Sequence, residues 1–288
     1  MRSIYTPVFA AITLLLLAGP AHAALASASA QASVNWSGLQ VKIIDLAPND
    51  GITPTLTWSN QSSNASAGSS NADPQAGAAA SNSNSSWNSA FGNSAFAGAS
   101  YAAGGSALNL SSAAQGNYGT TPCSPYYWYC SPQTNSGNSS LGRSGNFTFT
   151  GKGVAIVSLP WSIAASADPG SAMSSYSYPY FYNPTNASAT AYFSASYVTA
   201  GGTTVNAYSN NTAGNPYYVY PSLPFSDSKS GAFSFAIYND SGTPLSGTLS
   251  ASLGTSATAV LSPVPEPQTW GLMLAGLGLL GLRLRRRA

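Results

Sequence analysis

Side chains alternate between small apolar and polar types along residues 26–36, and this period of two constrains the fold more than any other feature. Alanine, valine and tryptophan occupy the even positions, with mainly serine, glutamine and asparagine between them. Such alternation predicts a β-strand with one buried face. Beyond Gly38 the phase flips, because Leu39, Val41 and Ile43 fall on odd positions. We therefore expect a strand with a bulge, or two strands around a bend.

Similar patterns recur along the chain. Residues 52–58, 146–150 and 154–161 read as strands, 189–199 and 203–208 as weaker ones, and Gly151-Lys152-Gly153 as a tight turn. Alternation around Phe233 to Ile237, a turn at 240–242 and alternation from Leu245 to Leu253 predict a hairpin. No stretch between residues 25 and 263 keeps a helical period of 3.6. The expected fold is all-β, an antiparallel β-sandwich or jelly-roll-like body over residues 24–262.

A low-complexity segment interrupts these patterns at residues 60–144. Within residues 60–120, 48 of the 61 residues are Asn, Ala, Ser or Gly. Few large side chains offset the entropy of ordering, so we expect a long, partly disordered insertion. The core is then expected from residues 25–58 and 145–254.

The first 23 residues have the pattern of a secretory signal peptide. Arg2 precedes an apolar stretch from Val8 to Gly19, and the small residues Ala21 and Ala23 flank His22. This order predicts an N-terminal signal helix cleaved after Ala23, with a non-cleaved signal anchor as the alternative.

The C-terminal segment, residues 263–288, combines a rigid turn, a short apolar run and a basic end. Its marked residues are Val264, Pro265, Glu266, Pro267, Arg283, Arg285, Arg286 and Arg287. The apolar run from Trp270 to Leu282 rises only about 20 Å as a helix, short of a bilayer core of about 30 Å. Counted over 268–284 with snorkelling arginines, it forms a short transmembrane helix with its basic end in the cytoplasm. A permanent anchor and a buried helix of a soluble domain are the alternatives.

This three-part order resembles the PEP-CTERM sorting signal of Gram-negative bacteria, a tail also labelled an ice-binding protein C-terminal domain. The resemblance covers about residues 263–287 and concerns the tail alone. It implies recognition by an exosortase, an integral-membrane cysteine protease, while the inner membrane holds the chain. It further implies delivery to the cell surface or to an extracellular polysaccharide matrix, with exopolysaccharide as a candidate partner.

Charge argues against a nucleic-acid partner. The whole chain carries nine basic and seven acidic residues, yet between residues 24 and 263 only four basic residues face six aspartates. The basic balance therefore comes from the two targeting segments. Charged residues make up 6% of the chain, and a neutral surface of hydroxyls and amides suits an extracellular setting.

The body offers little chemistry. His22, the only histidine, lies in the predicted signal peptide, so no histidine-based catalytic pair or metal site is expected in the mature protein. We expect no enzyme and no cofactor, with a glycosidase built from distant aspartates as the alternative. Asp45, Asn49 and Asp50 beside Gly51 favour Asx-turns over a calcium loop, whose spacing they miss.

Two cysteines enclose an aromatic cluster. Cys123 and Cys130 are the only cysteines, and in an oxidising compartment they are expected to form a disulfide rather than a redox pair, which needs Cys-x-x-Cys. The enclosed aromatic residues are Tyr126, Tyr127, Trp128 and Tyr129. Their rings are candidates for stacking on sugars, and packing at strand ends is the alternative.

These observations predict a non-enzymatic, exported cell-surface or matrix protein, with a lectin-like carbohydrate-binding module as the second hypothesis.

Overall fold

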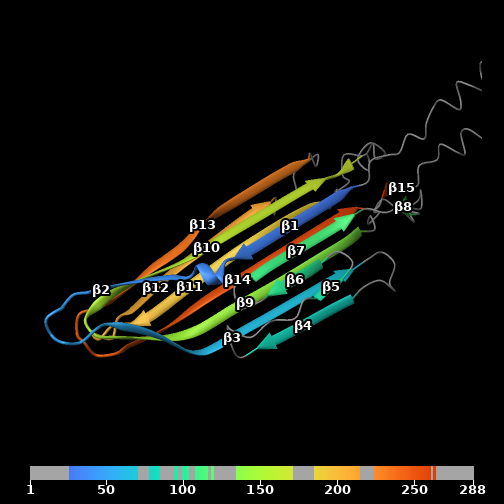
Figure 1. Ribbon diagram of the computed structural model, residues 1–288. Helices are drawn as coiled ribbons and strands as arrows, with labels where there is room; N and C mark the ends of the chain where they lie inside the picture. The colour runs from blue at the N-terminus through green and yellow to red at the C-terminus, as the bar shows by residue number, and fades with distance from the viewer. Residues whose placement is uncertain are drawn as a thin grey trace, which may run out of the picture.

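The computed structural model describes residues 26–70, 78–84, 94–96, 99–103, 108–115, 118–119, 134–170, 185–214, 224–260 and 262–263. Nearly all of them lie in β-strands (Figure 1), so the expected all-β class is confirmed. The predicted signal helix and the predicted membrane helix at 268–284 lie outside the described residues. Within the described part, no helix is long and apolar enough to cross a membrane.

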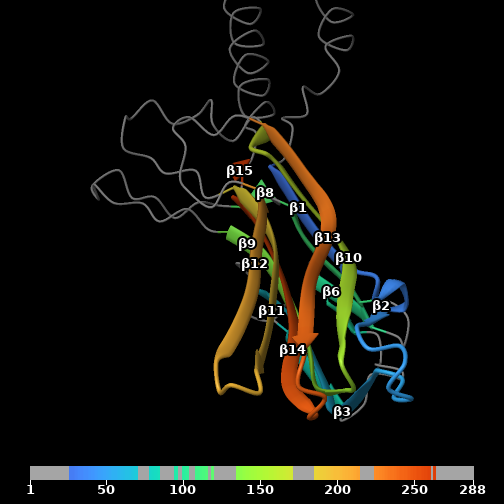
Figure 2. The same cartoon turned by 90° about the vertical axis from the view of Figure 1, so that its left-hand side faces the viewer.

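Two antiparallel sheets make up the body, here called sheet A and sheet B. Sheet A runs in the order β13 (Phe225–Asn239), β10 (Gly153–Asp168), β1 (Ser27–Val34), β7 (Leu108–Gln115), β6 (Ala99–Ala103) and β5 (Ser94–Phe96), with β2 (Gln40–Asp45) also paired to β10. Sheet B runs in the order β12 (Thr204–Gly214), β11 (Asn186–Val198), β14 (Leu245–Val260), β9 (Thr134–Thr150), β3 (Thr55–Ser70) and β4 (Ala78–Asn84). A short parallel pair joins β8 (Tyr118–Gly119) to β15 (Ser262–Pro263). Seen from the side, the two sheets form two layers with their strands nearly aligned (Figure 2).

The change of phase near Gly38 has a clear structural origin. β1 and β2 pair with the same edge of β10, and a single 3₁₀ turn, η1 (Trp36–Gly38), lies between them. Six positions from Val34 to Gln40 span only three on β10, from Trp161 to Ser158. The three extra residues reverse the alternation, because any odd insertion moves the following side chains to the opposite face. The predicted bend is therefore confirmed.

The predicted hairpin around residues 240–242 is wrong. Phe233, Phe235 and Ile237 are buried as the alternation predicts, but β13 pairs with β10 in sheet A. β14 pairs with β9 and β11 in sheet B. The turn therefore carries the chain from one layer to the other. Both strands have an apolar face. Because the two strands lie in opposite layers, both faces point into the core between the sheets.

The expected long insertion is also corrected. β3 continues through residue 70 and β9 begins at Thr134, and both belong to sheet B. Side chains between residues 60 and 144 are buried in the core, among them Ala65, Ala67, Ala114 and Leu141. Alanine gains little from burial but fits where the two sheets lie close together, so a composition of Ala and Ser does not exclude strands that share a core.

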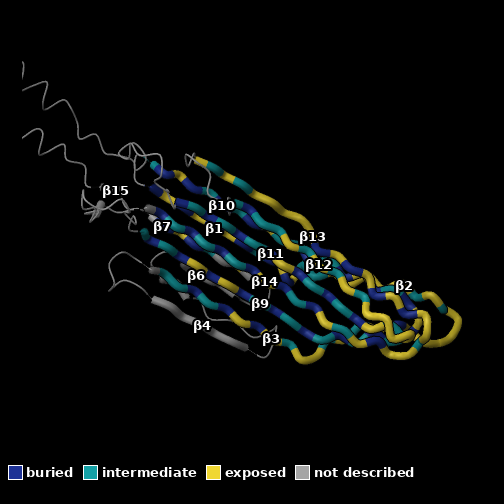
Figure 3. The backbone as a smooth tube through the Cα atoms, turned by 180° about the vertical axis from the view of Figure 1, so that it is seen from behind, coloured by how far each residue is buried: buried dark blue, intermediate teal, exposed yellow. Residues whose placement is uncertain are grey.

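The core changes in size along the strands. At one end it is built from alanines, including Ala28, Ala167, Ala187 and Ala257. At the other end Phe147, Phe149, Phe193, Phe233 and Phe235 pack with leucines and Ile237, and the Phe193 and Phe233 rings stack at 5.3 Å. Along each strand, buried positions alternate with more exposed ones, as Figure 3 shows.

Candidate functional site

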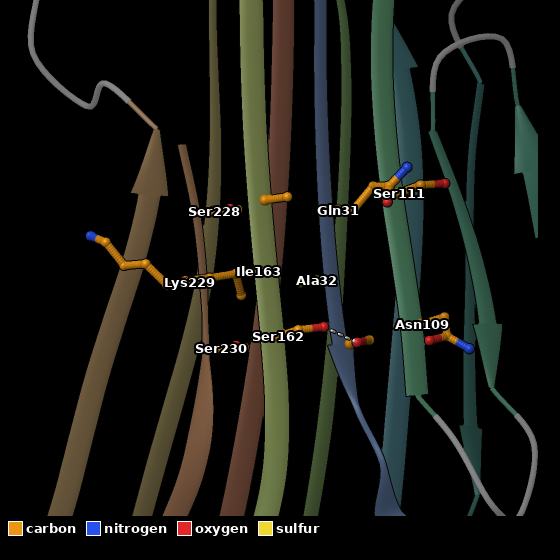
Figure 4. A pocket seen from close by; sticks show the side chains of 11 residues that line it. Gln31, Ala32, Asn109, Ser111, Ser162, Ile163, Ser228, Lys229 and Ser230 are labelled. Atoms are coloured by element: carbon orange, nitrogen blue, oxygen red, sulfur yellow. Dashed lines mark hydrogen bonds between the residues drawn. The ribbon is translucent and has the colours of Figure 1, made fainter. Parts of the chain in front are cut away.

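The outer face of sheet A carries a shallow groove of about 510 Å³ across β13, β10, β1 and β7. Strand register arranges its outward side chains in two rows that cross all four strands. One row is Ser228, Ala164, Gln31 and Ser111, and the other is Ser230, Ser162, Ser33 and Asn109. Figure 4 shows these side chains standing on neighbouring strands.

Short polar side chains line this groove because the same alternation that buries Ala32 and Ile163 turns their neighbours outward. Ser33 and Ser162 are hydrogen-bonded across β1 and β10, with their hydroxyl oxygens 2.7 Å apart. Beyond the row of Gln31 and Ala164 the arrangement recurs, with the hydroxyl oxygens of Ser29 and Ser166 2.9 Å apart. Cross-strand hydroxyl pairs of this kind present donors and acceptors at the regular spacing of a sheet.

Lys229 supplies the one charged side chain among the residues that line the groove. Its side chain extends away from the neighbouring serines (Figure 4). The ammonium donates to the carbonyl oxygen of Thr212 and lies 3.7 Å from Asp227. Asp227 also accepts a hydrogen bond from the backbone N–H of Gly214 at 3.1 Å. Lys229 and Asp227 on β13 thus contact the backbone of β12, and these contacts link the edge strand of sheet A to the edge strand of sheet B.

The lining residues offer hydrogen bonds and no apparatus to activate a nucleophile. A serine hydroxyl needs a neighbouring base to become reactive, and neither a histidine nor a carboxylate is among the residues that form the groove. The outward side chains of the groove can donate and accept hydrogen bonds.

Three of the scattered aspartates have local structural partners. A side-chain oxygen of Asp45 accepts from the N–H of Ala47, and Asp50 does the same for Ile52, both at 2.8 Å. Asp168 accepts from the N–H of Gly170 at 2.8 Å. The predicted Asx-turns at Asp45 and Asp50 are confirmed. Among the described residues, no cluster of three or more His, Cys, Asp or Glu side chains has the form of a metal site.

Most of the sequence-predicted site residues fall outside the described residues. This holds for the signal cleavage site, for Cys123 and Cys130, for the aromatic cluster between them, and for the sorting tail from Val264 onward. Their predicted roles remain predictions.

Sequence reasoning missed the groove, although its signal was present. The alternation at residues 26–36 places Gln31 and Ser33 opposite the buried alanines, hence on the outer face. The alternation within one strand does not specify which strands pair with it. Ser162 and Asn109 lie beside Ser33 because of the register between β10, β1 and β7.

Comparison with known proteins supports the prediction for the tail. A family model described as the PEP-CTERM protein-sorting motif matches residues 263–287. The resemblance predicted from Pro265-Glu266-Pro267, the apolar run and the terminal arginines is confirmed. No curated protein and no solved structure matches the chain.

Proposed function

We propose that this chain is a non-enzymatic protein of the cell surface or extracellular matrix, exported and then sorted through its C-terminal tail. The single observation that carries the proposal is the PEP-CTERM motif at residues 263–287. A motif of this kind implies export and recognition by an exosortase at the membrane. The chain is held in the inner membrane by its apolar segment until the exosortase processes the tail.

Two features of the body support this function. The described sheets carry few charges, and the outward side chains that line the groove of sheet A are mostly hydroxyls and amides, with no carboxylate or histidine among the lining residues. The groove thus favours adhesion over catalysis, because binding uncharged partners requires hydrogen bonds and surface area rather than an activated nucleophile.

Cell fractionation tests the sorting step. Replacing Pro265, Glu266 and Pro267 together by alanine should retain the protein in the inner membrane, whereas the wild-type chain should reach the surface or the medium. The matched control replaces Gln268 and Thr269 by alanine, which leaves the motif and its spacing intact. An unchanged location of the motif variant would refute sorting through this tail.

A second candidate function is carbohydrate binding by the body, favoured by the hydroxyl and amide side chains around Ser33 and Ser162 on the outer face of sheet A. On this hypothesis the aromatic cluster predicts that replacing Tyr126, Tyr127 and Trp128 together by alanine abolishes retention on the organism's own exopolysaccharide. Undiminished retention of that variant would remove the cluster as a binding site.

A further inference from the structure

Two tyrosines project from the outer face of sheet B at neighbouring positions. Tyr192 on β11 is paired with Asn210 on β12, and Tyr208 on β12 is paired with Ser194 on β11. Both tyrosines lie at even positions, opposite in direction to the buried Phe193 and Ala195. They are therefore diagonal neighbours on one face, close enough for both rings to contact one ligand.

The two rings are unusually exposed for aromatic side chains. Tyr208 is 78% exposed and Tyr192 is 43% exposed. In the described part of the chain no hydrogen bond, ion pair or ring contact engages either side chain. A tyrosine that contributes to the fold is buried or hydrogen-bonded, as Tyr197 on the same strand is, with its hydroxyl accepting from the N–H of Tyr238 at 3.2 Å. Packing in the core therefore does not explain why tyrosines occupy positions 192 and 208.

The rings continue two polar rows that cross sheet B. Register aligns Ser62, Ser144, Ser250, Ser194 and Tyr208 in one row, and Asn64, Gly142, Ser252, Tyr192 and Asn210 in the next. Hydroxyl oxygens within the first row lie 2.7 Å apart in the Ser62–Ser144 pair and again in the Ser194–Ser250 pair. Each row spans five adjacent strands (Figure 1), a length of roughly 19 Å at the usual strand spacing.

The chemistry of this face restricts what it can bind. None of the described outward-facing residues of β3, β9, β14, β11 and β12 is charged. A polyanion or an anionic membrane surface would find no ammonium or guanidinium here to neutralise it. An apolar protein surface would bury hydroxyl and amide groups without partners. A chain of uncharged sugars matches both components, because its hydroxyls pair with the rows and its C–H faces stack on the rings.

We propose that the outer face of sheet B binds an uncharged polysaccharide chain that crosses the strands, with Tyr192 and Tyr208 as stacking residues at one end of the two rows. The proposal gives a ligand class and a site to the carbohydrate-binding candidate function, on which it rests. It is independent of the aromatic cluster between the two cysteines and of the groove on sheet A.

Sedimentation with insoluble polysaccharides tests the proposal on the full-length chain. The uncharged probes are microcrystalline cellulose, chitin and starch granules, and the charged probe is calcium-crosslinked alginate. The protein is kept in a polyoxyethylene detergent, since alkyl glucosides would add sugars. We expect wild-type protein to bind at least one uncharged probe. Tyr192→Ala and Tyr208→Ala should each weaken that binding about fivefold or more, and the Phe variants should retain most of it.

Matched variants separate this face from other exposed surfaces. Tyr238→Ala removes a tyrosine that is 50% exposed on the outer face of sheet A, and it should leave binding unchanged. Ser144→Lys places a long charged side chain within the row and should weaken binding without altering either ring. Ser234→Lys places the same charged side chain in a hydroxyl pair on the outer face of sheet A, outside the groove, and should have no effect. Thermal unfolding of each variant confirms that the fold is retained.

Each contrary outcome has a distinct meaning. If wild-type protein binds none of the uncharged probes, or binds alginate alone, this site is refuted, and the carbohydrate-binding candidate is refuted with it if the wild-type chain is also not retained on the organism's own exopolysaccharide. If binding survives both tyrosine substitutions and Ser144→Lys, only the site is refuted. Loss of binding in a groove variant, Ser162→Lys, would then place the site in the groove of sheet A. Sorting of the Tyr192→Ala, Tyr208→Ala double variant, read by cell fractionation, stays normal in every case.

Discussion

At the scale of single residues, Arg143 is the one charged side chain among the buried residues of the described part of the chain. It is 1% exposed between the two sheets, and its Nε donates to the hydroxyl of Ser63 at 3.1 Å. Its guanidinium carbon lies 5.4 Å from the centre of the Trp36 ring, a cation–π contact. Burial lowers the pKa of Arg143, because removal from water disfavours the charged form. The side chain thus fills a large volume at an electrostatic cost.

Two substitutions distinguish these contributions. Arg143→Ala should lower the free energy of unfolding by about 2–4 kcal/mol, since it leaves a cavity and removes the contacts with Ser63 and Trp36. Arg143→Met should cost less than half as much, because it keeps most of the volume and removes the buried charge. Urea unfolding of the two variants measures the difference. Equal losses would mean that the guanidinium contacts, rather than the volume, dominate.

At the scale of elements, the turn η1 sets the phase of β2 against β1. Asn35 holds this turn, since its side-chain oxygen accepts from the N–H of Gly38 at 3.1 Å and from the hydroxyl of Ser37 at 2.7 Å. Asn35→Ala should destabilise the protein by about 1 kcal/mol through loss of this cap. Ser37→Ala, the control, keeps the bond to Gly38 and should cost clearly less. Thermal unfolding that ranks the two variants in the opposite order would contradict this role of Asn35.

The elements also show what sequence patterns do and do not contain. Alternation correctly predicts which side chains of β1, β13 and β14 are buried, because the period of two depends only on each strand's own residues. The alternation did not predict the connection at residues 240–242 correctly. A strand has the same apolar face whether the following strand pairs with it or lies in the other layer. Composition misled at residues 60–144, where the scarcity of large side chains predicted a long insertion although Ala65 and Ala67 belong to the core. The groove and the tyrosine pair depend on register between distant strands, which no local pattern specifies.

At the scale of the whole molecule, the change from an alanine core to an aromatic one implies unequal local stability. Burial of a side chain stabilises in proportion to its apolar area, about 25 cal/mol per Å², so the end of the sandwich around Ala28 and Ala187 gains far less than the end around Phe147 and Ile237. β10 pairs with β2 near its start and with β1 near its end, so it runs along both parts of the core (Figure 1). A single strand such as β10 therefore has one weakly and one strongly stabilised end.

Native-state hydrogen exchange measures this gradient within β10. Amides near Ala165 and Ala167, which pair with the alanines of β1, should exchange through local opening at a lower free energy than amides near Val157 and Leu159. We expect a difference of at least about 1 kcal/mol, since local openings range from near zero up to the global free energy of unfolding. Ala165→Gly is a control that should lower protection at its own end and leave the aromatic end nearly unchanged. Uniform protection along β10 would instead show that the two layers open only as one cooperative unit, and that the small side chains are compensated by the hydrogen-bonded ladder alone.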